Sequence, residues 1–154
     1  IRVIKNGRQC GCGRKGCLET YASSTGVVRS LSELESENKI NSSLLNLEKP
    51  SAKNIFDAAE KGDLFSLEII EYTAEILGSS LADFACFSNP KAYVLFGGIA
   101  QSGKYFTDRV KFYMEENLLN ILKNNIEIRT SSLHDKNAAI LGCAASIFLK
   151  EKVF

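Results

Sequence analysis

Apolar and polar residues alternate in patterns that divide the chain into helices and short strands. The longest pattern lies between Asp63 and Asn89, where apolar residues recur at steps of three and four and predict an amphipathic helix. Asp63 is placed to cap its start, and Pro90 disfavours helix in the residue before it. Further helices are predicted over residues 17–34, between Ser51 and Gly62, over 104–122 and over 137–149. The polar stretch 35–49 is expected to be a surface loop or a frayed helix.

Three segments have the composition of β-strands. Residues 92–96 form a continuous apolar run rich in aromatic and β-branched residues, which predicts a buried, parallel strand. Residues 1–4 and 126–128 are shorter candidates. Strands that alternate with helices indicate an α/β fold with parallel pairing, but so few strands make an incomplete sheet. The chain also opens in a strand-like run without an initiator Met, so we expect sheet-forming sequence to precede Ile1.

Composition and charge narrow the classes of function. With 154 residues, 45% of them hydrophobic and 24% charged, the chain is sufficient for one globular domain with its own core. A net charge of +1 gives no electrostatic footprint for nucleic acid or for an anionic membrane. The apolar runs are too short for a transmembrane helix, and the first residues lack the layout of a signal peptide.

The five cysteines fall into two groups. Cys10, Cys12 and Cys17 crowd together, whereas Cys86 and Cys143 stand alone in apolar helical contexts. An odd count without an export signal fits a reducing compartment, so we expect a cytoplasmic protein. The two lone cysteines are expected to be small buried hydrophobic residues.

The segment from Cys10 to Cys17 is a cysteine knuckle with three interleaved glycines. Three thiolates within eight residues suit tetrahedral zinc, and glycine lets the backbone wrap tightly around an ion. A chance cluster of buried thiols would not require the glycines, and a redox pair would favour Cys-x-x-Cys spacing. We predict a structural zinc site with an external fourth ligand, because the single His, His134, lies far away in the sequence. Arg14 and Lys15 are expected to face solvent.

The longer segment Cys10–Ser23 resembles the signature CxCGxxGCxExYAS of the ROK family of repressors, open reading frames and sugar kinases, and meets each of its fixed positions. Segments 62–63, 94–98 and 138–142 occur in the order that this family shows. The resemblance implies that residues 1–154 are the C-terminal domain of an actin-like, ribonuclease H-like ATPase fold carrying a zinc knuckle. The N-terminal lobe, with its phosphate motif, its catalytic Asp and the His that completes the zinc site, would precede Ile1.

The resemblance also assigns roles to individual residues. Cys10, Cys12 and Cys17 would bind zinc, and Glu19 would accept hydrogen bonds from sugar hydroxyls. Gly97 and Gly98, at the carboxyl end of the predicted strand, would contact ATP, with Gly103 as a weaker candidate. Judged by residue type alone, Glu19 would be a solvated residue at a helix start and Gly97-Gly98 a tight turn.

The activity implied is phosphoryl transfer from ATP, with Mg²⁺, to a hexose or N-acetylhexosamine, glucose first, by a homodimer or homotetramer. This chain supplies no catalytic base and would be inactive alone. One alternative is the effector-binding domain of a ROK repressor, whose upstream helix-turn-helix would bind DNA; another is a zinc-stabilised interaction module. His134 beside Asp135 has the composition of a catalytic pair, but a surface turn with helix capping explains Asp135.

Overall fold

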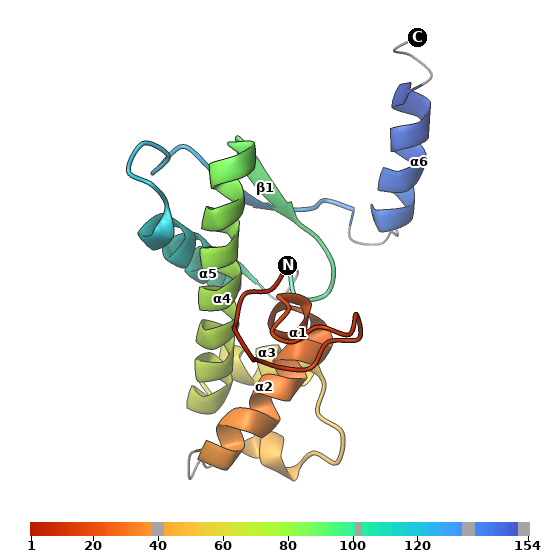
Figure 1. Ribbon diagram of the computed structural model, residues 1–154. Helices are drawn as coiled ribbons and strands as arrows, with labels where there is room; N and C mark the ends of the chain where they lie inside the picture. Colours follow the sequence, from red (N-terminus) through yellow and green to blue (C-terminus); the bar gives the residue numbers. More distant parts are fainter. Residues whose placement is uncertain (38–41, 101–102, 134–137, 151–154) are drawn as a thin grey trace.

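The computed structural model describes residues 1–37, 42–100, 103–133 and 138–150. Helices dominate it, and a two-stranded sheet lies beside them (Figure 1). In chain order the elements are α1 (Glu19–Ala22), α2 (Ser24–Glu37), the 3-10 helix η1 (Ser43–Asn46), α3 (Ala52–Glu60), α4 (Leu64–Ser88), β1 (Ala92–Leu95), α5 (Lys104–Asn117), β2 (Glu127–Thr130) and α6 (Ala138–Lys150). No described helix is long and apolar enough to cross a membrane.

Helix α4 is the long central element, and α1, α2, α3 and α5 pack around it (Figure 1). The predicted caps are confirmed: the Asp63 side chain accepts a hydrogen bond from the Ser66 amide, and Asn89 ends the helix in the left-handed conformation. Gly78 allows α5 to approach closely, because a Cβ there would lie 2.7 Å from both the Tyr113 Cβ and the Val110 carbonyl oxygen. The core follows this crossing, with Ile69, Ile70, Phe106, Val110 and Met114 fully buried.

The two strands pair in parallel, as predicted, with Ala92 opposite Glu127 and Leu95 opposite Thr130. The prediction that the first strand is buried is wrong, because Val94 is 59% exposed and none of its residues is fully buried. Helix α5 makes the connection between them. The Tyr93 hydroxyl donates to the Leu81 carbonyl at 2.9 Å and ties β1 to α4. The prediction of a strand over residues 1–4 is wrong. Among the described residues, Arg2 forms only an isolated bridge with Cys17, and no neighbouring segment pairs with this stretch over its length.

Several predicted boundaries shift. The single helix expected over residues 17–34 is two helices, α1 and α2, separated by the extended Ser23. The helix expected over 104–122 ends at Asn117, because Leu118 is extended. Part of the polar stretch 35–49 belongs to α2 and η1, and residues 38–41 lie outside the described part of the chain.

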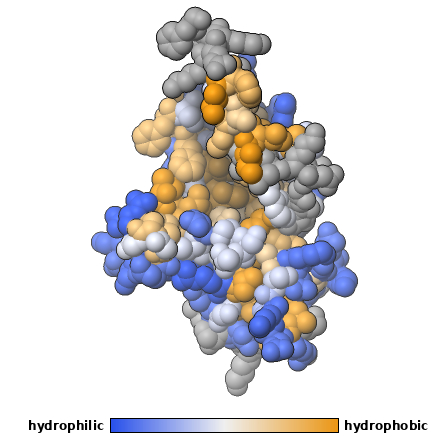
Figure 2. Space-filling model, turned by 90° about the vertical axis from the view of Figure 1, so that its right-hand side faces the viewer, coloured by the Kyte–Doolittle hydropathy of each residue, from blue (hydrophilic) through white to orange (hydrophobic). Residues whose placement is uncertain are grey.

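Helix α6 stands apart from the other described elements and packs against none of them (Figure 1). Its residues Ile140, Ile147 and Phe148 are more than 60% exposed, and so is Phe87 at the end of α4. Figure 2 shows apolar side chains gathered over the upper half of one face of the molecule. Cys86 and Cys143 are exposed in this chain, so the prediction that they are buried is wrong. Cys143 lies on α6, which contacts no other described element, and Cys86 lies near the end of α4 beside the exposed Phe87.

Candidate functional site

The knuckle owes its shape to two glycines in the left-handed region. Gly13 has a φ of 85° and Gly16 a φ of 74°. The turn is closed by hydrogen bonds from the Cys10 amide to the Arg14 carbonyl at 2.9 Å and from the Gly13 amide to the Cys10 carbonyl at 3.1 Å. A Cβ at Gly16 would lie 1.6 Å from the Ile4 carbonyl oxygen, so only glycine fits there.

This backbone brings together the three cysteines that the sequence singles out. Their sulfur atoms lie within 4.8 Å of one another, and the Cys12 and Cys17 sulfurs are 3.6 Å apart. Zinc–thiolate bonds of about 2.3 Å in a tetrahedron place two sulfurs about 3.8 Å apart. The donor set therefore fits a tetrahedral metal ion, with one position left for a ligand from elsewhere. Cys10 and Cys17 are buried and Cys12 is exposed, and all three thiols are free.

Charge and burial around the knuckle change the pKa values of two of its thiols in opposite directions. A hydrogen bond from the Arg14 side chain lowers the pKa of the Cys12 thiol to about 6. Burial raises the pKa of the Cys17 thiol. Metal binding requires thiolates, so Arg14 favours the metal-binding form of Cys12, whereas burial disfavours that form of Cys17. Arg14 and Lys15 are exposed, as predicted, but Arg14 also contributes to the electrostatics of the cluster.

Glu19 is the first residue of α1 and follows the knuckle directly. The Cys17 carbonyl accepts hydrogen bonds from the Thr20 amide at 2.9 Å and from the Thr20 hydroxyl at 2.7 Å. The third cysteine is thus built into the first turn of the helix that carries Glu19. The Glu19 side chain is exposed, which leaves it accessible to a ligand.

Gly97 and Gly98 follow the carboxyl end of β1, as predicted. Gly97 has a φ of 93°, and a Cβ at either residue would meet nothing within 4 Å, so packing does not require glycine there. Gly98 lines a cavity of about 510 Å³. The rest of its lining comes from the start of α2, from α3 with its capping residue, and from the loop after β1: Ser24, Ser51, Ala52, Lys53, Phe56, Asp57, Glu60 and Ile99.

Neither Glu19 nor the cysteines are among the residues lining this cavity, so the knuckle and the Gly98 cavity are separate features of the described chain. Gly103 is the residue before α5 and has a φ of 97°. His134 and Asp135 lie outside the described residues.

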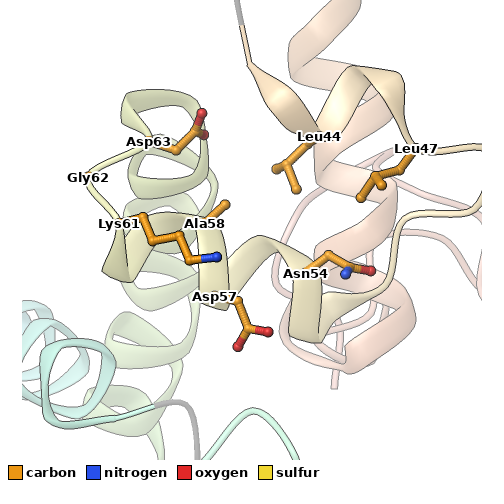
Figure 3. A pocket seen from close by; sticks show the side chains of 8 residues that line it. All are labelled: Leu44, Leu47, Asn54, Asp57, Ala58, Lys61, Gly62 and Asp63. Atoms are coloured by element: carbon orange, nitrogen blue, oxygen red, sulfur yellow. The ribbon is translucent and has the colours of Figure 1, made fainter.

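A second cavity, also about 510 Å³, lies between η1 and the turn from α3 to α4 (Figure 3). In Figure 3, Leu44 and Leu47 lie on one side, and Lys61 and Asp63 on the other. The sequence did not predict this cavity, because the stretch that contains η1 has a weak pattern. The Asp57 carboxylate at its edge accepts a hydrogen bond from Lys53 at 2.6 Å. None of the lining charges is buried, so nothing marks a particular ligand.

One residue that sequence reasoning missed is Arg8. Its side chain is only 4% exposed, although it carries a full charge. It lies two residues before Cys10. The sequence offers a weak signal at best, because an Arg in a polar turn is usually exposed.

Known proteins resemble the chain over most of its length. The family model described as "ROK family" matches residues 1–151. A glucokinase of Halalkalibacterium halodurans is 34% identical over 146 residues, which cover 92% of this chain and 44% of that protein. The transcriptional regulator NagC of Escherichia coli is 29% identical over 90% of this chain and 34% of its own length.

A solved structure agrees with these sequence matches. The ROK family glucokinase of Streptomyces griseus, in complex with glucose and AMPPNP, superposes with a TM-score of 0.78 at 27% identity. The match covers 87% of this chain and 45% of that one. The chain therefore has the α/β fold of this part of a sugar kinase, and it spans less than half the length of each of these relatives. The match of the family model to residues 1–151 shows that the chain belongs to the ROK family.

Proposed function

We propose that this chain is the C-terminal domain of a hexokinase-type sugar kinase that transfers the γ-phosphoryl group of ATP to a hexose, with glucose as the first candidate. The observation that carries the proposal is the continuity of the knuckle with α1. Three thiols whose sulfur atoms lie within 4.8 Å of one another lead directly into the helix whose first residue, Glu19, is an accessible carboxylate. Similarity to the glucokinases of H. halodurans and S. griseus supports this substrate class.

In this proposal Cys10, Cys12 and Cys17 hold a structural zinc ion, with the fourth ligand supplied by another part of the protein. When bound, the ion would supply a fixed cross-link between the three sulfurs, as structural zinc does. The Cys17 carbonyl, which accepts two hydrogen bonds from Thr20, carries this fixed geometry into α1. Glu19 then accepts hydrogen bonds from sugar hydroxyls, for which a carboxylate has several lone-pair positions.

Gly97 and Gly98 are proposed to contact ATP. They lie after β1, at the carboxyl end of a parallel strand, where open α/β sheets bind ligands. The cavity beside Gly98, about 510 Å³, falls within the size range of small-molecule sites. Mg²⁺ would offset the charge of the phosphates, and the catalytic base would come from outside this chain. The complete protein is proposed to be a homodimer or homotetramer.

The second candidate function is binding of a sugar effector by a ROK repressor. The specific observation that favours it is the similarity to NagC of E. coli. The knuckle, Glu19 and the zinc site would serve either function, because both require sugar recognition. N-acetylglucosamine would then be the effector to test, since a relative at the same identity is named the N-acetylglucosamine repressor.

The test is a coupled assay of the complete protein with ATP, Mg²⁺ and a panel of hexoses and N-acetylhexosamines, alongside elemental analysis for zinc. We expect ATP-dependent phosphorylation of one hexose and about one zinc per chain, as four-ligand sites hold. Glu19→Gln should weaken sugar binding, whereas Glu68→Gln, at an exposed position on α4, should not. Tight sugar binding without phosphorylation would favour the repressor, and binding of no sugar would contradict both candidates.

A further inference from the structure

Arg8 places a buried charge between the knuckle and the helices that follow it. One of its terminal nitrogens, Nη1, donates to the Thr20 carbonyl at 2.6 Å and to the Gly26 carbonyl at 3.0 Å. The other, Nη2, donates to the Ser30 hydroxyl at 2.9 Å, and Nε donates to the Glu33 carboxylate at 2.8 Å. Burial of a guanidinium is costly unless its donors are satisfied. Here each nitrogen of the guanidinium has a hydrogen-bond partner, so the buried charge is fully satisfied.

The backbone of Arg8 belongs to the knuckle. Its amide donates to the Tyr21 hydroxyl at 2.9 Å, and its carbonyl accepts from the Gly16 amide at 2.8 Å. Its guanidinium carbon lies 4.3 Å from the centre of the Tyr21 ring and 5.9 Å from that of Tyr72 in α4. One residue thus joins the base of the knuckle to α1, α2 and α4.

The two carbonyls that share Nη1 lie on either side of the break between α1 and α2. Ser23 is extended at this break, so the last carbonyls of α1 are not satisfied by a continuing helix. Gly26 allows α2 to approach α1, since a Cβ there would lie 2.7 Å from the Tyr21 carbonyl carbon. Arg8 donates to one carbonyl from each helix across this contact.

Helix α1 has four residues, too few to hold its own direction by internal hydrogen bonds. Its orientation is therefore set from outside, by packing against α2 and α4, by the Cys17 carbonyl and by the Arg8 guanidinium. Loss of either support would let the helix rotate or fray, and Glu19 would move with it.

We propose that Arg8 is a positioning residue that fixes α1 against the knuckle and thereby holds Glu19 in place for the sugar. This inference rests on the proposed role of Glu19 in sugar binding. It separates two supports of the same helix: the Cys17 carbonyl, in the proposed metal site, accepts from the amide and hydroxyl of Thr20, and Arg8 donates to the Thr20 carbonyl. Sugar affinity should accordingly depend on Arg8 even in protein that retains its metal.

The experiment compares Arg8→Lys and Arg8→Met with the wild type in the complete protein. Lysine keeps the charge but lacks the planar fork that reaches both carbonyls and Ser30. We expect the KM for the hexose to rise about 10-fold to 100-fold, as metal affinity or activity falls when a group that orients a metal ligand is removed, because Arg8 would orient Glu19 in the same indirect way. The value of kcat should change much less, and zinc content should stay the same. Arg129→Met is the matched control, because that arginine pairs with Glu127 and its side chain is 63% exposed.

Two further measurements separate positioning from a loss of stability. Ser30→Ala is the variant to use if the arginine variants fail to fold. It removes one partner of the guanidinium and leaves the ion pair with Glu33, so it should also raise the KM. The double variant of Arg8→Lys with Glu19→Gln should bind sugar no more weakly, by calorimetry, than Glu19→Gln alone.

The outcomes distinguish the inference from the function on which it rests. Folded, zinc-containing Arg8 and Ser30 variants with a wild-type KM would overturn the inference and leave the kinase proposal standing. Additive losses in the double variant would overturn it as well, since Arg8 would then act independently of Glu19. A wild-type protein that binds no hexose would overturn the proposed function and this inference together.

Discussion

The knuckle with α1 and the crossing of α4 with α5 are held together by different forces. At the crossing, long helices bury apolar side chains such as Val110 and Met114, and Gly78 lets the backbones approach. At the knuckle, the apolar contribution is small, and the chain is held by glycine turns, by the Arg8 hydrogen bonds and by whatever the three thiols bind. The first region depends on the packing of many atoms, so each contact contributes a small part of its stability. The second region depends on a few polar groups, so the loss of any one of them removes a large part.

The largest difference between the two regions is expected when a proposed metal ligand is replaced. Cys17→Ser removes one of three sulfurs, and apparent binding free energies of structural zinc are on the order of 10 kcal/mol at neutral pH. We expect stoichiometric zinc to be lost and amide protection in α1 and α2 to fall, with protection in α4 and α5 largely retained. Elemental analysis and hydrogen exchange provide the measurements. Cys86→Ser, at an exposed cysteine, should change neither, and a Cys17→Ser protein that kept its zinc would contradict the assignment.

The helix crossing should respond to Gly78→Ala. The added methyl group would collide with Tyr113 and with the α5 backbone, so we expect a loss of about 1–3 kcal/mol in the free energy of unfolding by urea. Zinc content should not change. Gly142→Ala is the matched control, because a Cβ there meets nothing within 4 Å and alanine favours helix by up to about 1 kcal/mol. Equal effects of the two substitutions would show that the crossing has room to relax.

An effect no larger than this is expected at the polar edge of the same crossing, where Glu71 of α4 accepts hydrogen bonds from Tyr105, Arg109 and Tyr113 of α5. Burial opposes ionisation of Glu71, but these hydrogen bonds outweigh it and lower its pKa below the usual carboxyl value. A lowered folded-state pKa gives stability that is fully present above the usual value and is lost as the pH falls through the lowered one. Glu71→Gln should therefore cost about 1–3 kcal/mol at neutral pH and progressively less in acid.

Urea unfolding of the wild type and Glu71→Gln at neutral and acid pH measures this difference. Lys104→Met is the control. Lys104 forms an ion pair with Asp108, and its side chain is 85% exposed. Exposed ion pairs of this kind contribute at most about 1 kcal/mol. A loss from Glu71→Gln that did not shrink in acid would mean that the carboxylate charge is not what holds the helices.

Sequence patterns predicted the packed region far better than the knuckle region. The α4 pattern and its Asp63 cap, the parallel pairing of β1 with β2 and the approximate places of α3, α5 and α6 could all be predicted, because apolar periodicity and capping residues are local signals. The strand over residues 1–4 could not be judged in this way, because a strand requires a partner and Arg2 finds only Cys17. The end of α5 at Asn117 could not be predicted either, because Leu118 is extended although the apolar pattern continues beyond it.

The candidate site divides along the same line. The three cysteines could be predicted to converge, because their spacing and glycines are local, and the structure brings their sulfurs within 4.8 Å. The break between α1 and α2 has a local signal that the apolar pattern missed, because the Ser23 side chain accepts a hydrogen bond from the Gly26 amide at 3.0 Å, as a helix N-cap does. The hydrogen bonds that Arg8 makes across the break could not be predicted. Arg8 and Ser30 are 22 residues apart in sequence, and nothing in the periodicity relates them.

The isolation of α6 has a practical consequence for handling the chain. Ile140, Ile147 and Phe148 on α6, together with Val94 and Phe96 near β1, present large apolar side chains to water. Apolar surface of this kind promotes association between molecules. We expect the chain expressed alone to self-associate, so its mass by light scattering should rise with protein concentration and fall on addition of mild detergent. Subunit number should therefore be measured on the complete protein.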